Sequence, residues 1–331
     1  MKEEVVLKVE ELQVYLPSQE GMLRAVNGVN LEIKKGKILG LVGESGCGKS
    51  VMSLSLLKLL KNKDWKTEGE VRLKERNIFS LSEEEMRKQR GKEIAMIMQN
   101  PMSVFDPLRT IGSHFVDTIQ NHIKVSVREA KKIAIENLKK VSLPEAEKIM
   151  RQYPFQLSGG MLQRVMIAIA IAMNPDVLIA DEPTTALDVT VQYQILGQLK
   201  SLVKHNNTGV LLVSHDLGVI AQMADEVAVM YCGYIVEKAP VEELFKHPAH
   251  PYTRGLLASR FQLNKKRLKP IEGQPPSLLN LGNQCPFLER CSEVEAACRE
   301  YTMDEVGGIK NHLVRCVKYA RGKEMILDEL A

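Results

Sequence analysis

Hydrophobic positions in the first third of the chain alternate with polar ones or form short apolar runs, a pattern that predicts β-strands. The segment 5–14 is rich in Val and Leu, and two further strands at 31–33 and 37–42 lie on either side of a glycine turn. Apolar residues at helical spacing over 50–60 predict a helix directly after a glycine-rich loop. Further apolar runs predict strands at 70–73, 93–98, 177–180, 210–214 and 227–231.

A long insertion separates the strands predicted at 93–98 and 177–180. Residues from about 101 to 156 read mostly as helix, and 130–141 form the clearest amphipathic stretch. Strands that alternate with helices are typical of a mainly parallel sheet with helices on both of its faces. The pattern therefore predicts an α/β fold.

A late strand is predicted at 233–238 and short helices at 241–246 and 252–259. After residue 259 the composition of the chain changes. A basic segment at 260–274 ends in Gly and Pro residues and predicts a linker. We predict an α/β domain at 1–259, with N-terminal antiparallel strands and a helical subdomain at about 101–175, followed by a C-terminal extension at 260–331.

Composition and charge narrow the class of protein. The 331 residues are 44% hydrophobic and 26% charged, as in an ordinary globular protein. No stretch approaches the roughly 20 apolar residues of a membrane span, and the N-terminus lacks the apolar core of a secretion signal. We therefore expect a cytoplasmic protein that reaches a membrane only through a partner. The 45 basic and 41 acidic residues nearly balance, so no nucleic-acid partner is expected.

A phosphate-binding loop is the strongest chemical signal in the sequence. Residues 43–50 follow the pattern glycine, four residues, Gly-Lys-Ser, between an apolar strand and a helix. Glycines let backbone N–H groups point at phosphate oxygens, Lys49 reaches the β- and γ-phosphates, and the Ser50 hydroxyl ligates Mg²⁺. The predicted nucleotide contacts are Gly43, Ser45, Gly46, Cys47, Gly48, Lys49, Ser50 and Val51.

Two acidic residues end the apolar strand at 177–180. Asp181 at this position can hold Mg²⁺, through water, beside the phosphate loop. Glu182 can polarise the water that attacks the γ-phosphate, a general-base role typically worth about 10²–10⁴ in rate. We predict catalytic roles for Glu182 and Lys49.

A second anion-binding helix start lies at 157–163. Ser158 is suited to cap the following helix, and the glycines after it, including Gly160, leave backbone N–H groups open for a phosphate. One nucleotide does not need two such sites. The redundancy predicts a composite site in which this segment serves the ATP of a second subunit.

Together these motifs resemble the nucleotide-binding domain of ABC transporters, with 157–163 as the signature motif of that family. The resemblance implies that Gln99 joins the Mg²⁺ site and senses the membrane subunits, and that His215 orients the γ-phosphate and the attacking water. It also implies that the loop 186–188, with Asp188, crosses the dimer interface, and that Tyr15 stacks on adenine.

Further segments resemble the oligopeptide/dipeptide importers within this family, namely 99–102, 106–107, 153–154, 247–253 and 273–276. One departure is Asp106, where many relatives have Asn. The resemblance implies an ATPase on the cytoplasmic face of the cell membrane that works with a second ATPase subunit, either a paralogue or a second copy. Two transmembrane permeases and an external substrate-binding protein are the other implied partners. Peptides are the expected cargo and nickel is the alternative, while a soluble ABC ATPase without a transport role is less expected.

Four cysteines in the extension have no place in the ATP site. Cys285, Cys291, Cys298 and Cys316 lie in one short segment of a chain without a secretion signal, which suggests a metal. The tight cysteine pairs of zinc ribbons are missing. Tails of the importer family resemble this one and imply a [4Fe–4S] cluster, with zinc, free thiols or disulfides as alternatives.

Overall fold

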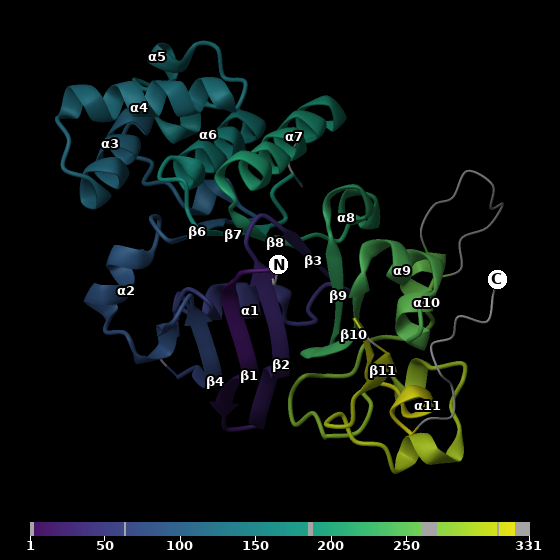
Figure 1. The fold of residues 1–331 in the computed structure, drawn as a ribbon. Helices are drawn as coiled ribbons and strands as arrows, with labels where there is room; N and C mark the ends of the chain where they lie inside the picture. The colour runs from purple at the N-terminus through teal and green to yellow at the C-terminus, as the bar shows by residue number, and fades with distance from the viewer. Residues whose placement is uncertain (1–2, 63, 185–187, 260–269, 310, 322–331) are drawn as a thin grey trace. The chain divides into compact units, whose positions relative to one another are not determined.

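The computed structural model describes residues 3–62, 64–184, 188–259, 270–309 and 311–321. The chain divides into two compact units (Figure 1). Unit 1 comprises Met1–Leu7, Ile33–Ile38 and Leu73–Val213, and unit 2 comprises Lys8–Glu32, Leu39–Arg72 and Ser214–Ala331. The predicted boundary at 259/260 remains a prediction, because the linker 260–269 lies outside the described residues.

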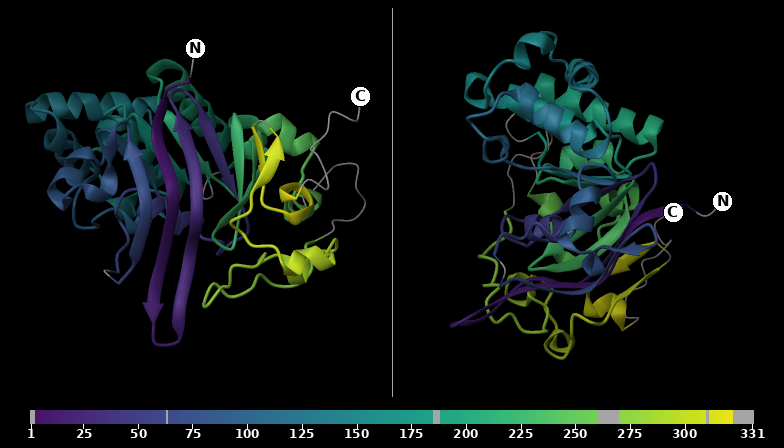
Figure 2. Two further views of the ribbon diagram at one scale, coloured as in Figure 1. Left: turned by 60° about the horizontal axis from the view of Figure 1, so that its bottom comes forward. Right: turned by 90° about the vertical axis from the view of Figure 1, so that its left-hand side faces the viewer.

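The N-terminal strands form a long hairpin. β1 (Val5–Ser18) and β2 (Gly21–Lys34) are joined by a short turn, and β4 (Lys66–Leu73) lies on the other side of β1 (Figure 2). Their buried positions alternate with exposed ones, as a sheet with one packed face requires. The strand predicted at 31–33 is therefore the end of a much longer one, because polar residues on its outer face hid the alternation.

The helical insertion belongs to unit 1. α3 (Ile111–His122), α4 (Val127–Lys140) and α6 (Gly159–Ile171) pack together (Figure 1). The amphipathic stretch predicted at 130–141 lies on α4 and its C-terminal end, where Ala130, Ala134 and Leu138 are buried. The strands of this unit, β6 (Ile94–Ile97), β7 (Val177–Asp181) and β8 (Gly209–Val213), are parallel neighbours in that order. The described part of unit 1 also contains the short elements β5 (Arg76–Asn77), η1 (Ile78–Ser80), α2 (Glu83–Gln89), η2 (Pro101–Ser103), α5 (Ala146–Ile149) and η3 (Pro154–Gln156), and the long helix α7 (Val189–Asn206).

Unit 2 carries the other strands of the core. β3 (Ile38–Val42), which begins at the last residue of unit 1, pairs in parallel with β9 (Glu226–Tyr231), and β10 (Tyr234–Pro240) pairs with β9 in the antiparallel sense. All five residues of β3 are buried, as expected for a central strand. The helices of unit 2 include α1 (Lys49–Ser55), α8 (Leu217–Met223), α9 (Val241–Lys246) and α10 (Pro251–Ala258). α1 ends earlier than predicted because the chain turns at Lys58, whose φ is 52°.

The extension continues the sheet of unit 2. β12 (His312–Val314) pairs with β10, and β11 (Gly307–Ile309) pairs with β12. Two short 3₁₀ helices, η4 (Leu288–Arg290) and η5 (Ala296–Arg299), and the short helix α11 (Val317–Ala320) also belong to it. The extension has a buried core of Phe287, Tyr301, Met303, Val314 and Val317. These three-residue strands are too short to show a period in the sequence.

Candidate nucleotide site

The phosphate loop follows β3 in unit 2 and is shaped by its glycines. Gly46 and Gly48 have φ angles of 80° and 107°, in a region that side chains rarely adopt. A Cβ on Gly48 would lie 2.1 Å from the carbonyl oxygen of Ala25, and one on Gly46 would meet nothing within 4 Å. Gly48 is thus required by packing, whereas Gly46 is required by its backbone conformation.

The lysine of the loop is folded into its curl. The Lys49 ammonium donates to the carbonyl oxygens of Gly43 and Glu44, at 2.8 and 2.9 Å, and its side chain is 8% exposed. Ser50 follows at the start of α1 and is exposed, and Val51 is half-buried. The loop therefore brings the predicted lysine, hydroxyl and glycine backbone together within one turn of chain.

Tyr15 lies on β1, in a pocket of about 190 Å³ that Gln13, Met22 and Arg24 also line. Its hydroxyl donates a hydrogen bond to the Glu68 carboxylate, which raises the pKa of the Tyr15 phenol. The predicted adenine partner thus lines a hollow of unit 2.

The acidic segment lies in unit 1 at the end of β7. Asp181 is buried and lies opposite Val213 of β8. Glu182 has a φ of 49°, and its N–H donates to the carbonyl oxygen of Val213 at 2.9 Å. Its carboxylate accepts a 2.9 Å hydrogen bond from Nε2 of Gln99. The structure thus brings together two residues, 83 positions apart, that the sequence analysis assigned to one reaction.

The signature segment begins helix α6 as predicted. Ser158 caps the helix by accepting from the N–H of Met161 at 3.3 Å. A Cβ on Gly159 would meet nothing within 4 Å, so this helix start is open. Gln163, 1% exposed, donates to the carbonyl oxygen of Pro183 at 3.0 Å. The signature helix is therefore bonded to the residue next to Glu182.

The sequence pattern did not indicate that Gln163 links the signature helix to the acidic segment. It also did not indicate the contact of Arg164, which donates from Nε to the carbonyl oxygen of Gly160 at 3.4 Å and whose pKa is lowered by burial. The 3.6-residue period of the helix places both residues one turn after the glycines. That spacing was the only signal the sequence offered for either contact.

The loop after the acidic segment and His215 complete the predicted set. Residues 185–187 lie outside the described residues, but Asp188 caps α7 by accepting from the N–H of Val191 at 3.0 Å. His215 is an exposed residue of unit 2 in the turn before α8. In that turn, the hydroxyl of Ser214 accepts a 3.0 Å bond from the N–H of Asp216, which in turn caps α8.

The predicted magnesium donors suit the metal chemically. Ser50 offers a hydroxyl, Asp181 a carboxylate and Gln99 an amide oxygen, and Mg²⁺ prefers oxygen ligands of these kinds. Because Nε2 of Gln99 is already engaged by Glu182, its Oε1 is the atom available to a metal.

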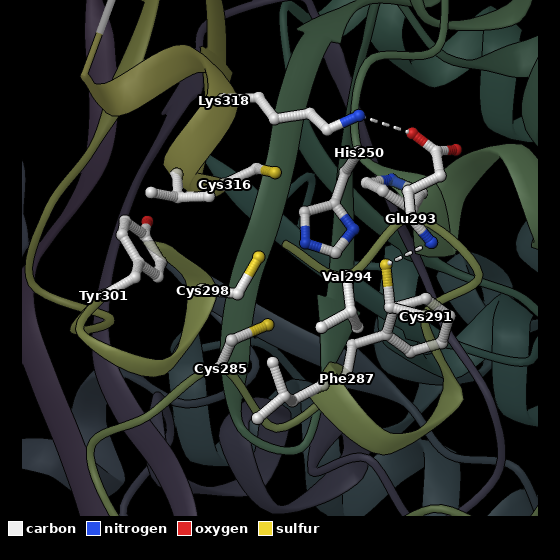
Figure 3. Close-up of a pocket in the computed structure, with 13 residues that line it drawn as sticks. His250, Cys285, Phe287, Cys291, Glu293, Val294, Cys298, Tyr301, Cys316 and Lys318 are labelled. Atoms are coloured by element: carbon white, nitrogen blue, oxygen red, sulfur yellow. Dashed lines mark hydrogen bonds and ion pairs between the residues drawn. The ribbon is translucent and has the colours of Figure 1, made fainter. Parts of the chain in front are cut away.

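The four cysteines of the extension line one pocket, shown with its neighbours in Figure 3. Its cavity is about 30 Å³, close to the space of one water molecule. All four cysteines are free, and burial raises the pKa of Cys285 to about 12 and that of Cys316 to about 11.

Among the described residues, no group of three or more His, Cys, Asp or Glu side chains could hold a metal ion. The sulfur of Cys291 instead accepts from the N–H of Glu293, and that of Cys298 from the N–H of Glu295, both at 3.4 Å. The prediction of a [4Fe–4S] cluster at these cysteines is therefore wrong, and the zinc alternative has no support either.

Helices long and apolar enough to cross a bilayer are absent from the part of the chain that the structure describes.

The ABC transporter family matches residues 26–185, and the family described as "Oligopeptide/dipeptide transporter, C-terminal region" matches residues 236–298. The second match covers part of the extension.

The chain is similar to curated proteins over most of its length. It is 46% identical to a probable peptide ABC transporter ATP-binding protein of Sinorhizobium fredii, covering 90% of each chain. It is 43% identical to the dipeptide transport ATP-binding protein DppD of Bacillus subtilis, covering 95% of this chain and 94% of the relative. A probable D,D-dipeptide transport ATP-binding protein of Escherichia coli is 41% identical, covering 94% of this chain and 96% of the relative.

Among solved structures, the chain resembles the ATP-binding cassette MJ0796 in a dimeric post-hydrolysis state bound to ADP and Pi. The TM-score is 0.65 and the identity 31%, covering 71% of this chain and 98% of the cassette. A second dimeric structure of the same cassette gives a TM-score of 0.64 over the same shares.

Proposed function

Because the chain belongs to the family of ATP-binding subunits of peptide ABC transporters, we propose that it hydrolyses ATP to drive the uptake of di- and oligopeptides through partner permeases. The observation that carries this proposal is the occurrence, in one chain, of the Gln99–Glu182 pair and of the C-terminal region matched by oligopeptide/dipeptide transporters. A likeness limited to the ATP site would support an ABC ATPase of any kind.

The predicted site residues have distinct roles toward the nucleotide. The phosphate loop binds the phosphates through its backbone and Lys49, and Tyr15 stacks on adenine. Ser50 and Gln99 would hold Mg²⁺ directly and Asp181 would hold it through water, and the ion would neutralise charge on the phosphates.

Glu182 accepts a proton from the attacking water, and the hydrogen bond from Gln99 fixes the direction of its carboxylate. His215 orients the γ-phosphate and that water. Because Gln99 contacts the general base and also follows β6, a movement of its segment changes the position of the Glu182 carboxylate. This contact links the membrane subunits to the chemistry.

The signature segment serves the nucleotide of a second ATPase subunit, a paralogue or a second copy. The open helix start at Ser158 and Gly160 supports this, and Asp188 lies at the start of α7 on the same unit. Closure of two subunits around ATP is favoured because ATP contacts both only in the closed state. Hydrolysis removes that bridge and reopens the pair.

The permeases dock on the helical insertion of unit 1. Large apolar side chains are exposed at Met102, Leu108 and Phe155, and the ring of Phe155 stacks on that of Tyr153 at 5.6 Å. Exposed apolar side chains of this size mark interaction surfaces. We place the subunit on the cytoplasmic face of the membrane, with an external binding protein delivering the peptide to the permeases.

The cargo is tested with the assembled transporter in sealed vesicles. We expect ATP-dependent uptake of a labelled dipeptide that Glu182→Gln abolishes and that Glu84→Gln, at an exposed carboxylate on α2 outside the helical insertion, leaves unchanged. Uptake of Ni²⁺ without uptake of peptide would favour the nickel alternative. ATP hydrolysis that no permease and no cargo affects would overturn the transport role.

A further inference from the structure

The C-terminal extension contacts the phosphate loop directly through one ion pair in unit 2. Nη1 and Nη2 of Arg290 donate to the two carboxylate oxygens of Glu44, at 2.7 and 3.0 Å. The Arg290 side chain is only 5% exposed and that of Glu44 26%. A two-pronged arginine–carboxylate bond of this kind is among the stronger polar contacts in proteins and fixes direction as well as distance.

Arg290 is itself held on all sides. Its Nε donates to the carbonyl oxygen of Glu272 at 3.0 Å, and Nη1 also donates to the hydroxyl of Tyr231 at 3.1 Å. The guanidinium lies over the rings of Tyr231 and Phe287, with 5.7 and 5.9 Å to their centroids. The side chain is therefore a fixed arm of the extension rather than a mobile surface charge.

Glu44 is held by its backbone as well. Its N–H donates to the hydroxyl of the buried Tyr252 of α10 at 2.9 Å. Its carbonyl oxygen accepts from the Lys49 ammonium at 2.9 Å and from the N–H of Cys47 at 3.3 Å. The residue that the extension holds is thus also the residue that holds the phosphate-binding lysine.

The same face of the loop is lined by the segment that leads into the extension. A cavity of about 300 Å³ lies between Glu44–Cys47 and residues Gln274, Pro275 and Pro276. The extension therefore approaches the loop at two places, through the Arg290 side chain and through this wall.

We propose that Arg290 is a positioning residue for nucleotide binding, through which the extension holds Glu44 and sets the phosphate loop in its binding conformation before ATP arrives. The proposal rests on the role proposed for this loop in ATP binding. Preorganisation lowers the entropic cost of binding, so its loss weakens binding of ATP and ADP alike. An interaction that is equal in ground and transition states changes KM and leaves kcat nearly unchanged.

The alternative is that Arg290 only packs the extension onto unit 2. A packing role would lower the melting temperature of Arg290→Gln without changing the affinity of the folded protein for nucleotide. The two roles predict different effects of Glu44→Gln, because Glu44 belongs to the phosphate loop. A positioning role predicts a weaker affinity for nucleotide in this variant, and a packing role predicts an unchanged affinity.

The experiment measures the Kd for MgATP and MgADP, the KM and kcat of the assembled transporter, and thermal unfolding. The variants are Arg290→Gln, Arg290→Lys, Glu44→Gln and the double variant. The matched control is Arg321→Gln, which removes a similar two-pronged bond to Glu305, at 3.2 and 3.2 Å, within the extension. Lys49→Ala tests the loop itself.

We expect Arg290→Gln and Glu44→Gln each to raise Kd and KM by about tenfold, the size of one charge-assisted hydrogen bond, with kcat within about twofold. The double variant should be no worse than either single variant, Arg290→Lys should recover part of the affinity, and Arg321→Gln should bind as wild type does. Additive effects of the two changes, or an unchanged Kd in folded Arg290→Gln, would overturn the proposal. If Lys49→Ala also binds normally, the role of the loop fails as well, and the two failures are thereby distinguished.

Discussion

The phosphate loop and the acidic segment are held in different ways. The loop takes its support from segments far along the chain, since Glu44 is bonded to Tyr252 and to Arg290, 246 residues away. The acidic segment takes its support from Gln99, which follows β6, and from Gln163 of the signature helix α6. Support for the loop thus comes from Tyr252 of α10 and Arg290 of the extension, and support for Glu182 comes from residues before and within the helical insertion.

This difference indicates how the molecule can be regulated. A change at Arg290 should act first on nucleotide affinity, and a change at Gln99 or Gln163 should act first on turnover. Substitutions at both kinds of position test that division.

Glu182→Gln removes the general base and keeps the shape of the side chain. We expect the rate of hydrolysis to fall by about 10²–10⁴ while MgATP still binds and traps a closed pair of subunits. Single-turnover phosphate release and size-exclusion chromatography with ATP measure the two effects. Glu84→Gln, at an exposed carboxylate on α2, is the control. Undiminished hydrolysis by Glu182→Gln would refute the catalytic assignment.

His250 accepts a hydrogen bond from the N–H of Tyr252, the residue that contacts Glu44 of the loop. His250→Asn tests its contribution through the pH dependence of stability. Burial lowers the pKa of His250 to about 4, from an ordinary value of 6.5, so the folded state resists its protonation. The contribution of neutral His250 to the free energy of unfolding is therefore fully present above pH 6.5. It falls by about 3 kcal/mol as the pH drops to 4, because the unfolded chain takes up the proton at a higher pH than the folded one.

Asn keeps an oxygen that can accept from the N–H of Tyr252, as Nδ1 of His250 does at 3.0 Å. Urea unfolding at a series of pH values should give a flatter profile between pH 6.5 and 4 for His250→Asn than for wild type. Parallel profiles for the two proteins would contradict the assignment of this proton to His250.

Gln163→Leu cuts the bond between the signature helix and Pro183. We expect a loss of about 1–3 kcal/mol in the free energy of unfolding, because a buried carbonyl oxygen loses its donor. We also expect kcat to fall more than the affinity for ATP, since Glu182 lies next to the released residue. Gln120→Leu removes a similar amide-to-carbonyl bond on the exposed face of α3 and should change neither. A larger effect on Kd than on kcat would break the proposed division.

Tyr252→Phe removes the hydroxyl that accepts from the N–H of Glu44 and leaves the ring in place. We expect the smallest effect of the set, a rise of about fivefold in the Kd for MgATP, because one neutral hydrogen bond is worth about 1 kcal/mol. Tyr234→Phe removes a hydroxyl that donates to Asn283 in the same unit and serves as control. Equal affinities for the two variants, measured by calorimetry, would show that the bond from Tyr252 does not position the loop.

Local patterns predicted the elements that carry the site. Each of these features is encoded by residues that are close together in the sequence. They are the individual strands, the glycine loop, the helix start at Ser158 and the acidic end of β7. The contacts that join these elements were not predictable in the same way. The contact between Glu44 and Arg290 spans 246 residues, and no spacing rule relates two positions that far apart.

For the four cysteines of the extension, a local sequence pattern led to a wrong prediction. Residue type and crowding suggested a metal site, but a metal needs ligands arranged around one point, which spacing along the chain does not show. Among the described residues, the structure contains no group of three or more His, Cys, Asp or Glu side chains that could hold a metal ion. The extension is held by its apolar core and by strand pairing to β10.

The central claim is that the extension sets nucleotide affinity through the loop while Glu182 sets the rate of the chemistry. Single-turnover hydrolysis by the assembled transporter, followed over a range of MgATP concentrations, tests it in one experiment. We predict that Arg290→Gln shifts the half-saturating concentration upward by about tenfold and reaches nearly the wild-type limiting rate. Glu182→Gln should keep the half-saturating concentration and lose the limiting rate. A reduced limiting rate with unchanged half-saturation in Arg290→Gln would contradict the account.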